Sequence, residues 1–129
     1  MSRTPFQLCR GRKLSRKRAG DRGEKIALEY LIGKGYTLVE RNYRTRFGEI
    51  DLILRSGNTL VFAEVKLRRG SEFGGPLEAV TPNKQARIRG LAEGYLADAE
   101  PEFDDVRFDV VGILETGRGR EIQHVPHAF

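Results

Sequence analysis

Residues 48–66 read GEIDLILRSGNTLVFAEVK, two apolar runs joined by turn residues. Residues 49–54 and 59–67 are rich in branched and aromatic side chains, which favour strands. Residues 55–58, between them, are Arg-Ser-Gly-Asn, a combination typical of tight turns. The stretch therefore predicts an antiparallel β-hairpin, and the rest of the fold is expected to form around it.

Three charged residues stand out in this hairpin, because they interrupt or follow its apolar runs. Asp51 begins one arm, and Glu64 and Lys66 lie on the other. Side chains alternate along a strand, so Glu64 and Lys66 share a face with Leu60 and Phe62. Charges on such a face are costly unless partners compensate them. Asp51, across the hairpin, is the nearest candidate partner.

The same residues suit the hydrolysis of phosphodiesters. Asp51 and Glu64 supply the hard oxygen ligands that Mg²⁺ or Mn²⁺ prefers, and the backbone carbonyl of Val65 offers a further ligand. A metal held there activates water and stabilises charge on phosphate. Lys66 would orient the water or offset the developing negative charge. The hairpin thus predicts a metal-dependent nuclease site that needs no histidine or cysteine.

Outward from the hairpin, helices alternate with further strands. Asp21 is expected to be the N-cap of a helix, and Glu24, three residues later, is expected to complete a capping box. This helix is expected to end near Gly33. Thr81 and Pro82 are expected to start a second, amphipathic helix. Strands are expected at residues 36–43, 106–114 and, at an edge, 120–125. The order predicts an α/β domain with a mixed sheet and helices on its faces, in which the second helix is a crossover to a parallel strand.

Composition limits the classes of protein that fit. The 129 residues suit one domain, and the single cysteine excludes an internal disulfide and a thiolate zinc cluster. No apolar run is long enough to span a bilayer, so no membrane partner is expected, and a cytoplasmic location is the simplest expectation.

The net charge of +5 is unevenly distributed. Residues 1–20 hold seven basic residues and no acidic one, which leaves 16 basic and 18 acidic residues in 21–129. Residues 1–20 are therefore expected to form a flexible basic arm, and residues 21–129 the folded domain.

Eight short stretches carry a resemblance to a known family. They span about residues 20–113 and comprise residues 20–24, 40–44, 48–53, 61–66, 73–76, 79–81, 84–85 and 107–109. In these stretches the chain resembles the YraN family of bacterial proteins, which is similar to the archaeal Holliday-junction resolvases of the restriction-endonuclease-like, PD-(D/E)XK, superfamily. Ile50 stands where the superfamily's name has proline.

The resemblance implies a restriction-endonuclease-like three-layer fold and assigns roles to five residues. Asp51 and Glu64 would be metal ligands and Lys66 catalytic, while Glu24 would reach the site from the first helix and Gln85 would border it from the second. It also implies that nucleic acid is the partner, with branched or structured DNA as the substrate. Junction-cutting relatives act as dimers, so the resemblance is compatible with a homodimer.

Several of these residues have simpler interpretations that the sequence leaves open. Glu24 fits a capping box, Gln85 fits a hydrogen bond at a helix start, and Glu49 is expected to be largely solvated. The basic side chains around the hairpin either contact phosphates or are simply solvated; they are Arg44, Arg46, Arg68 and Arg69. Arg107 and Asp109 are expected to pair, and His124 and His127 to lie on the surface.

Two other functions compete with the nuclease. One is a nucleic-acid-binding module that keeps the fold without cutting. The other is a structural or scaffolding protein in which Asp51, Glu64 and Lys66 form an ion-paired hairpin that holds no metal. Buried ion pairs contribute little to stability, which favours a functional site.

Overall fold

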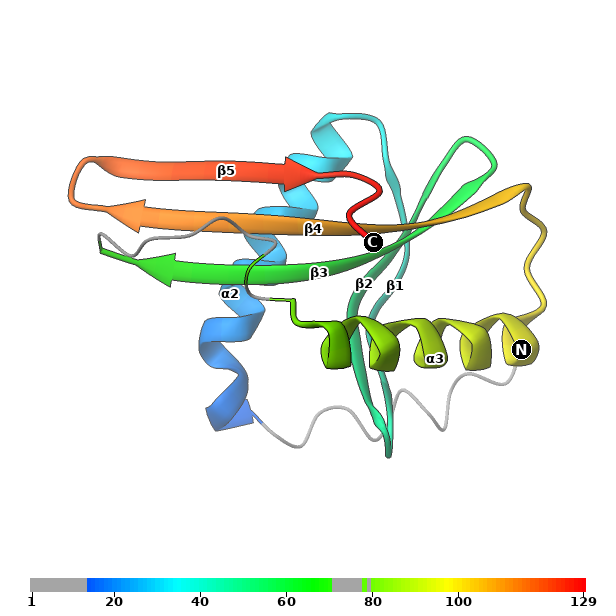
Figure 1. Cartoon of the computed structure of the whole chain (residues 1–129). Coiled ribbons are helices and arrows are strands. Elements are labelled where there is room, and N and C mark those ends of the chain that lie inside the picture. The colour runs from blue at the N-terminus through cyan, green and yellow to red at the C-terminus, as the bar shows by residue number, and fades with distance from the viewer. Residues whose placement is uncertain (1–13, 71–77, 79) are drawn as a thin grey trace.

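The structure, a computed structural model, describes residues 14–70, 78 and 80–129. Two helices and five strands follow one another in the order drawn in Figure 1. They are α2 (Leu14–Gly33), β1 (Thr37–Thr45), β2 (Gly48–Ser56), β3 (Thr59–Arg69), α3 (Pro82–Ala99), β4 (Asp105–Thr116) and β5 (Gly119–Val125). All five predicted strands are present, with ends that differ by a few residues from those expected.

The five strands form one mixed sheet in the order β1-β2-β3-β4-β5. The predicted hairpin is confirmed, because β2 and β3 pair antiparallel with Leu52 opposite Ala63. β3 and β4 pair in parallel, and α3 makes the crossover between them. β5 pairs antiparallel with β4 and forms one edge of the sheet, as expected.

Helices cover both faces of this sheet, which gives three layers (Figure 1). On one face, Leu91 and Tyr95 of α3 pack against Ile53 and Phe62. On the other face, the α2 cluster joins Ala27 and Leu31 to strand residues that include Leu52, Val61 and Val111. Because each strand buries alternate side chains against a different helix, the central strands read as continuous apolar runs. The expected α/β, restriction-endonuclease-like architecture is confirmed.

The first helix begins earlier than predicted. α2 starts at Leu14, so Asp21 lies within the helix and is not its N-cap. Residues 14–20 (LSRKRAG) include Leu, Arg, Lys and Ala, residues that form helices readily without an apolar stripe. The capping-box role of Glu24 is therefore wrong, and so is the end of the expected arm at residue 20. Residues 1–13 of that arm lie outside the described residues.

The second helix begins as predicted. The hydroxyl of Thr81 accepts a hydrogen bond from the backbone N–H of Lys84 at 3.2 Å, and Pro82 occupies the first turn. Neither α2 nor α3, the helices of the described chain, combines the length and apolar content that a membrane span requires.

Candidate metal centre

The regular alternation of side chains breaks down at Asp51. Ile50 packs on the α3 face of the sheet, whereas Leu52, two residues later, packs on the α2 face. In β1, the residue between the partners of Ile50 and Leu52 is Asn42, whose φ of 57° is left-handed. This left-handed conformation, which asparagine tolerates better than most residues, lies in β1 beside the point where β2 changes face.

The side chain of Asp51 bonds to the backbone of β3 just beyond the end of the β2–β3 ladder. The ladder between β2 and β3 ends at the pair Leu52–Ala63. Beyond that pair, the carboxylate of Asp51 accepts a hydrogen bond of 2.8 Å from the N–H of Val65. A hydrogen bond from the backbone holds the carboxylate in a defined position beside Glu64, the residue before Val65.

Glu24 reaches the same place from α2. A methyl group built on Gly23 would lie 3.2 Å from Cβ of Leu67, so the absence of a side chain there allows α2 to pack closely on β3. Glu24 follows Gly23 and is 4% exposed. A glycine in the helix therefore allows a buried carboxylate to lie against the sheet.

Three carboxylates meet at this point. Oxygen atoms of Glu24, Glu49 and Asp51 lie within 4.8 Å of one another. Burial raises the pKa of Asp51 well above its ordinary value of 3.8, and the negative charge of Glu64 raises it further. The hydrogen bond from Val65 lowers the same pKa, while the charges of Glu24 and Glu49 raise it. The cluster therefore concentrates negative charge that a bound cation would neutralise.

Basic side chains surround the cluster. Lys84 of α3 lies 3.1 Å from Glu64, whose side chain is 12% exposed. Arg41 lies 3.6 Å from Glu24. Arg44 lies 3.0 Å from Glu49. The carboxylates of Glu24, Glu49, Asp51 and Glu64, here called the carboxylate group, therefore include three that lie within ion-pair distance of a basic side chain.

Glu49 and Lys84 are the residues whose part in the site the sequence analysis missed. The side chain of Glu49 is 27% exposed and belongs to the carboxylate group, so the expectation that it is largely solvated is wrong. Its position two residues before Asp51, on the same side of a strand, was the available signal. For Lys84, at the start of α3, no local pattern indicates a contact with β3.

The other predicted site residues belong to β3 and α3. Lys66 is half-buried on β3, two residues beyond Glu64. The amide of Gln85 donates to the carbonyl of Val80 at 3.1 Å, which is the helix-start hydrogen bond that the sequence left open. The N–H of Val65, rather than its carbonyl, makes the contact that the structure records with Asp51.

The four arginines proposed for phosphate contacts differ in their exposure to solvent. Arg46 and Arg69 are exposed, and the Arg69 side chain is 73% exposed. Arg44 is occupied by its ion pair with Glu49, and Arg68 is half-buried. Arg46 is therefore well placed to meet a polymer of phosphates, and so is Arg69, which pairs with Glu115 at 3.7 Å but keeps most of its side chain exposed.

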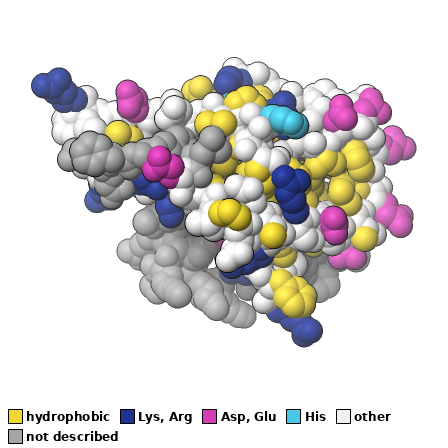
Figure 2. Space-filling view, viewed as in Figure 1, with side chains coloured by type: hydrophobic (Ala, Val, Ile, Leu, Met, Phe, Trp, Pro, Cys, Tyr) yellow, Lys and Arg dark blue, Asp and Glu magenta, His cyan; other side chains and the backbone are white. Residues whose placement is uncertain are grey.

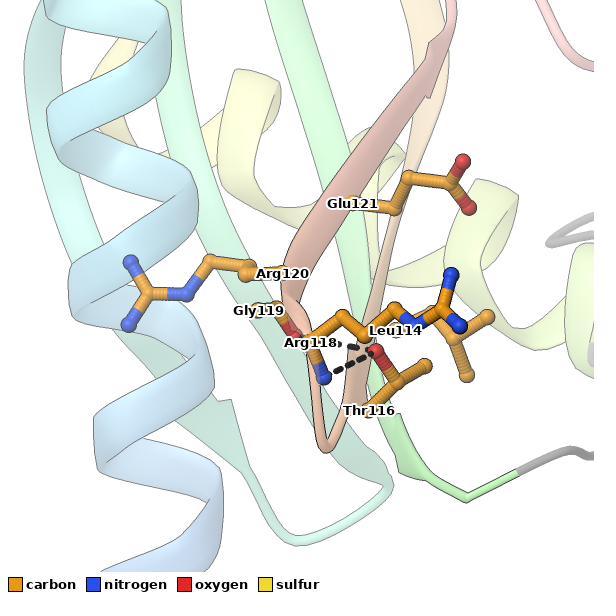
Figure 3. Close-up of a pocket in the computed structure, with 6 residues that line it drawn as sticks. All are labelled: Leu114, Thr116, Arg118, Gly119, Arg120 and Glu121. Carbon is orange, nitrogen blue, oxygen red and sulfur yellow. Dashed lines mark hydrogen bonds between the residues drawn. The ribbon is translucent and has the colours of Figure 1, made fainter.

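A shallow pocket lies elsewhere, at the turn between β4 and β5 (Figure 3). Its lining includes Arg118 and Arg120, which project to opposite sides of the turn, and none of the four carboxylates. Next to it, Glu115 forms ion pairs with Arg22, Arg69 and Arg120. We infer that these ion pairs hold α2, β3 and β5 together, because the single carboxylate of Glu115 pairs with one arginine from each of them.

A second polar network, at the β4–β5 edge, is built on Asp109, which is fully buried. The predicted pair is confirmed, since Arg107 donates two hydrogen bonds of 2.9 Å to Asp109. His124 lies 2.7 Å from the same carboxylate and its side chain is 2% exposed, so its expected surface position is wrong. Tyr36, which contacts both Arg107 and the ring of His124, covers the network. His127 is exposed, as expected.

Gly48, at the start of β2, carries a testable constraint on the site. Its φ of +145° is one that side-chain-bearing residues rarely adopt, and an added methyl group would lie 3.1 Å from Cδ of Arg87. Gly48→Ala is therefore expected to lower the free energy of unfolding by about 1–3 kcal/mol. Urea denaturation measures this. Gly57→Ala is the matched control, because Gly57 has a φ of +62° and open space around it. Equal losses in both variants would show that Gly48 is not specially constrained.

Comparison with known proteins identifies relatives over most of the chain. Residues 23–113 match the profile described as uncharacterised protein family UPF0102, a range that contains every residue of the carboxylate group. A UPF0102 protein of Rhodococcus jostii is 50% identical over 112 residues, which cover 85% of this chain and 94% of the relative. A UPF0102 protein of Dictyoglomus turgidum is 40% identical over 118 residues, which cover 90% of this chain and all of the relative.

Proposed function

This chain belongs to the uncharacterised protein family UPF0102, and from the geometry of its carboxylate group we propose that it is a metal-dependent nuclease. The reaction is the hydrolysis of a phosphodiester bond, with Mg²⁺ or Mn²⁺ as the cofactor. The observation that carries the proposal is the meeting of Glu24, Glu49 and Asp51 within 4.8 Å. Such crowding of like charge destabilises a fold, so a function is its best explanation.

The residues of the group fit a divalent cation. Carboxylate oxygens are hard ligands, and a Mg²⁺ site commonly uses a few of them together with water and substrate phosphate. Asp51, Glu24 and Glu49 would hold the ion, and Glu64 adds its charge from β3. The chemistry that such an ion supplies when bound is activation of water and stabilisation of charge on phosphate.

The chain's own groups would then orient the substrate and balance charge. The N–H of Val65 holds the carboxylate of Asp51 in place. Lys84 holds Glu64 by their ion pair of 3.1 Å. Lys66 provides a positive charge near the site of reaction, where negative charge develops on the phosphate oxygens. These roles extend the sequence prediction by adding Lys84 as a positioning residue.

Nucleic acid is the substrate that matches the surrounding charges. Arg46 and Arg69 would contact phosphates on either side of the site, and such contacts supply affinity without sequence preference. Branched or structured DNA is the substrate class that we favour by resemblance. A homodimer would place two such sites for paired cuts, and a cytoplasmic location accords with the single cysteine.

One observation favours a second candidate, a structural role. Glu24, Glu49 and Glu64 each have a basic side chain within 4.0 Å, as an ion-paired network would require. Against it stands Asp51, whose raised pKa reflects burial and repulsion by neighbouring carboxylates. Repulsion of this kind costs stability, and a network that served only to stabilise the fold would not be expected to retain it.

Lys66→Ala is expected to reduce cleavage of DNA by about 10²- to 10³-fold while leaving the fold intact, because it removes a charge that stabilises the transition state. The measurement is cleavage of labelled branched, single-stranded and duplex DNA in Mg²⁺, with EDTA as the metal-free reference. Lys25→Ala is the matched control, because Lys25 is an exposed lysine on α2.

The outcomes separate the candidates. Cleavage that persists in Lys66→Ala would assign the activity to another site or to a contaminant. Binding without cleavage of any of the three substrates by the wild-type protein would support the non-cleaving module. Wild-type protein that neither binds nor cleaves DNA would support the structural role.

A further inference from the structure

The turn between β1 and β2 exposes a large aromatic side chain. Phe47 is 71% exposed, more than any other large hydrophobic residue in the described part of the chain. Its backbone N–H bonds to the hydroxyl of Thr45 at 3.0 Å, which defines the turn. Figure 2 shows hydrophobic and basic side chains together at the tip of this hairpin. Turn tips usually carry small or polar residues, so an exposed phenylalanine here requires an explanation.

Arginine accompanies the exposed ring. The guanidinium carbon of Arg46 lies 5.2 Å from the centre of the Phe47 ring, which is a cation–π distance. Arg44 lies at the end of β1, where it pairs with Glu49, and the side chain of Arg87 on α3 lies beside Gly48, the first residue after the turn. An aromatic face among arginines suits a partner that is both flat and negatively charged. Nucleobases on a phosphate backbone have both properties.

The tip is close to the carboxylate group and its orientation is constrained. Glu49 follows Phe47 by two residues, a separation of about 7 Å along an extended chain. Glu49 belongs to the proposed metal ligands. The side chain of Arg87 on α3 lies close to Gly48, the residue after Phe47, so this end of the hairpin lies beside α3. A base held on the Phe47 ring would therefore belong to a nucleotide beside the reaction site.

We propose that Phe47 and Arg46 form a stacking site for an unpaired base, so that the substrate is nucleic acid with unstacked bases next to the cleaved bond. This inference rests on the proposed function in taking nucleic acid as the ligand. Bases inside a duplex already stack on one another, whereas bases at gaps, ends and junctions have a free face. Phe47 thus provides a physical reason for the preference for structured substrates that the resemblance implied.

The test compares binding of two DNA duplexes of the same sequence, one fully paired and one with a single-stranded gap. Fluorescence anisotropy is measured in EDTA, so that cleavage does not interfere. Wild-type protein is expected to prefer the gapped duplex, and Phe47→Ala to lose about 5- to 100-fold in affinity for it. Affinity for the paired duplex should hardly change. Ile32→Ala, which removes an exposed hydrophobic side chain from α2, is the matched control and should behave as wild type.

A second variant reports stacking directly. The chain contains no tryptophan, so Phe47→Trp introduces a single indole at the tip. A stacked base is expected to quench its emission when a deoxythymidine oligonucleotide is added, and paired duplex is expected to have little effect. Phe47→Trp should also keep the preference for gapped DNA, because an aromatic face remains.

Three outcomes would overturn the inference. The first is that Phe47→Ala still prefers the gapped duplex. The second is that the indole of Phe47→Trp responds equally to the oligonucleotide and to paired duplex. The third is that the wild-type protein binds neither the gapped nor the paired duplex. If Phe47→Ala instead changes the oligomeric state in sedimentation without changing that preference, a second copy of the chain is the partner. The cleavage assay remains separate. If Phe47→Ala loses the preference for gapped DNA and the wild-type protein does not cleave DNA, base stacking is supported and the nuclease is rejected. If the wild-type protein cleaves DNA and Phe47→Ala keeps the preference, the nuclease is supported and base stacking is rejected.

Discussion

Asp51→Asn is expected to make the metal-free protein more stable and at the same time to abolish its stabilisation by Mg²⁺ or Mn²⁺. Asparagine has nearly the same shape and still accepts the hydrogen bond from Val65, but it removes the charge that Glu64 repels. A ligand present at about 100 times its Kd stabilises a protein by about 2.7 kcal/mol. That increment should appear in the wild-type protein and vanish in the variant. Cleavage should fall by at least about 10²-fold, since metal-ion catalysis contributes several kcal/mol.

The pH dependence of the metal-free protein follows from the direction of the pKa shift. The pKa of Asp51 is higher in the folded chain than its ordinary value of 3.8, so folding favours its protonated form. The contribution of Asp51 to stability is therefore lost as the pH rises from about 3.8 through the raised pKa. In EDTA, the wild-type protein should show this decline and Asp51→Asn should lack it. Metal affinity of the wild-type protein should increase over the same range, because the metal binds the ionised carboxylate.

Urea denaturation with and without divalent ions measures both effects. Asp98→Asn is the control, because Asp98 is an exposed acid on α3, and it should respond to metal as the wild-type protein does. A structural role for Asp51 makes the opposite prediction: the variant would be less stable, and neither protein would respond to metal. That result would reject the candidate metal centre.

Asp109→Ala is expected to lower the free energy of unfolding by about 3–5 kcal/mol. The substitution removes an acceptor that receives hydrogen bonds from Arg107, His124 and the backbone N–H of His127, and it leaves these donors near a buried gap. A domain of this size has about 5–15 kcal/mol of stability in total, so the variant should be partly unfolded at moderate temperature.

Acid should weaken the same network. Burial alone would raise the pKa of Asp109, but hydrogen bonds from His124, Arg107 and His127 lower it to about 2. Its contribution to stability is present above about 3.8 and is lost as the pH falls toward 2. Asp105→Ala, at the exposed start of β4, is the control and should change stability by less than about 0.5 kcal/mol. Similar unfolding midpoints for the two variants would contradict a structural role for Asp109.

Strand and helix positions were predictable because their signals are local. Alternation and turn residues placed the β2–β3 hairpin, and the apolar stripe placed α3 behind its Thr81 cap. The start of α2 was missed because residues 14–20 form helix by intrinsic propensity rather than by apolar spacing. The sequence read without the structure therefore identified the layers of the fold but misplaced one helix boundary.

What the sequence determined by itself is the set of candidates Asp51, Glu64 and Lys66, because period-two alternation within one hairpin is a local property. Only the tertiary structure decided which side chains meet. Glu24 reached the group because Gly23 allows close packing of α2 on β3. Lys84 and His124 found their partners across elements distant in sequence. Such contacts depend on how whole layers pack, and no local pattern carries that information.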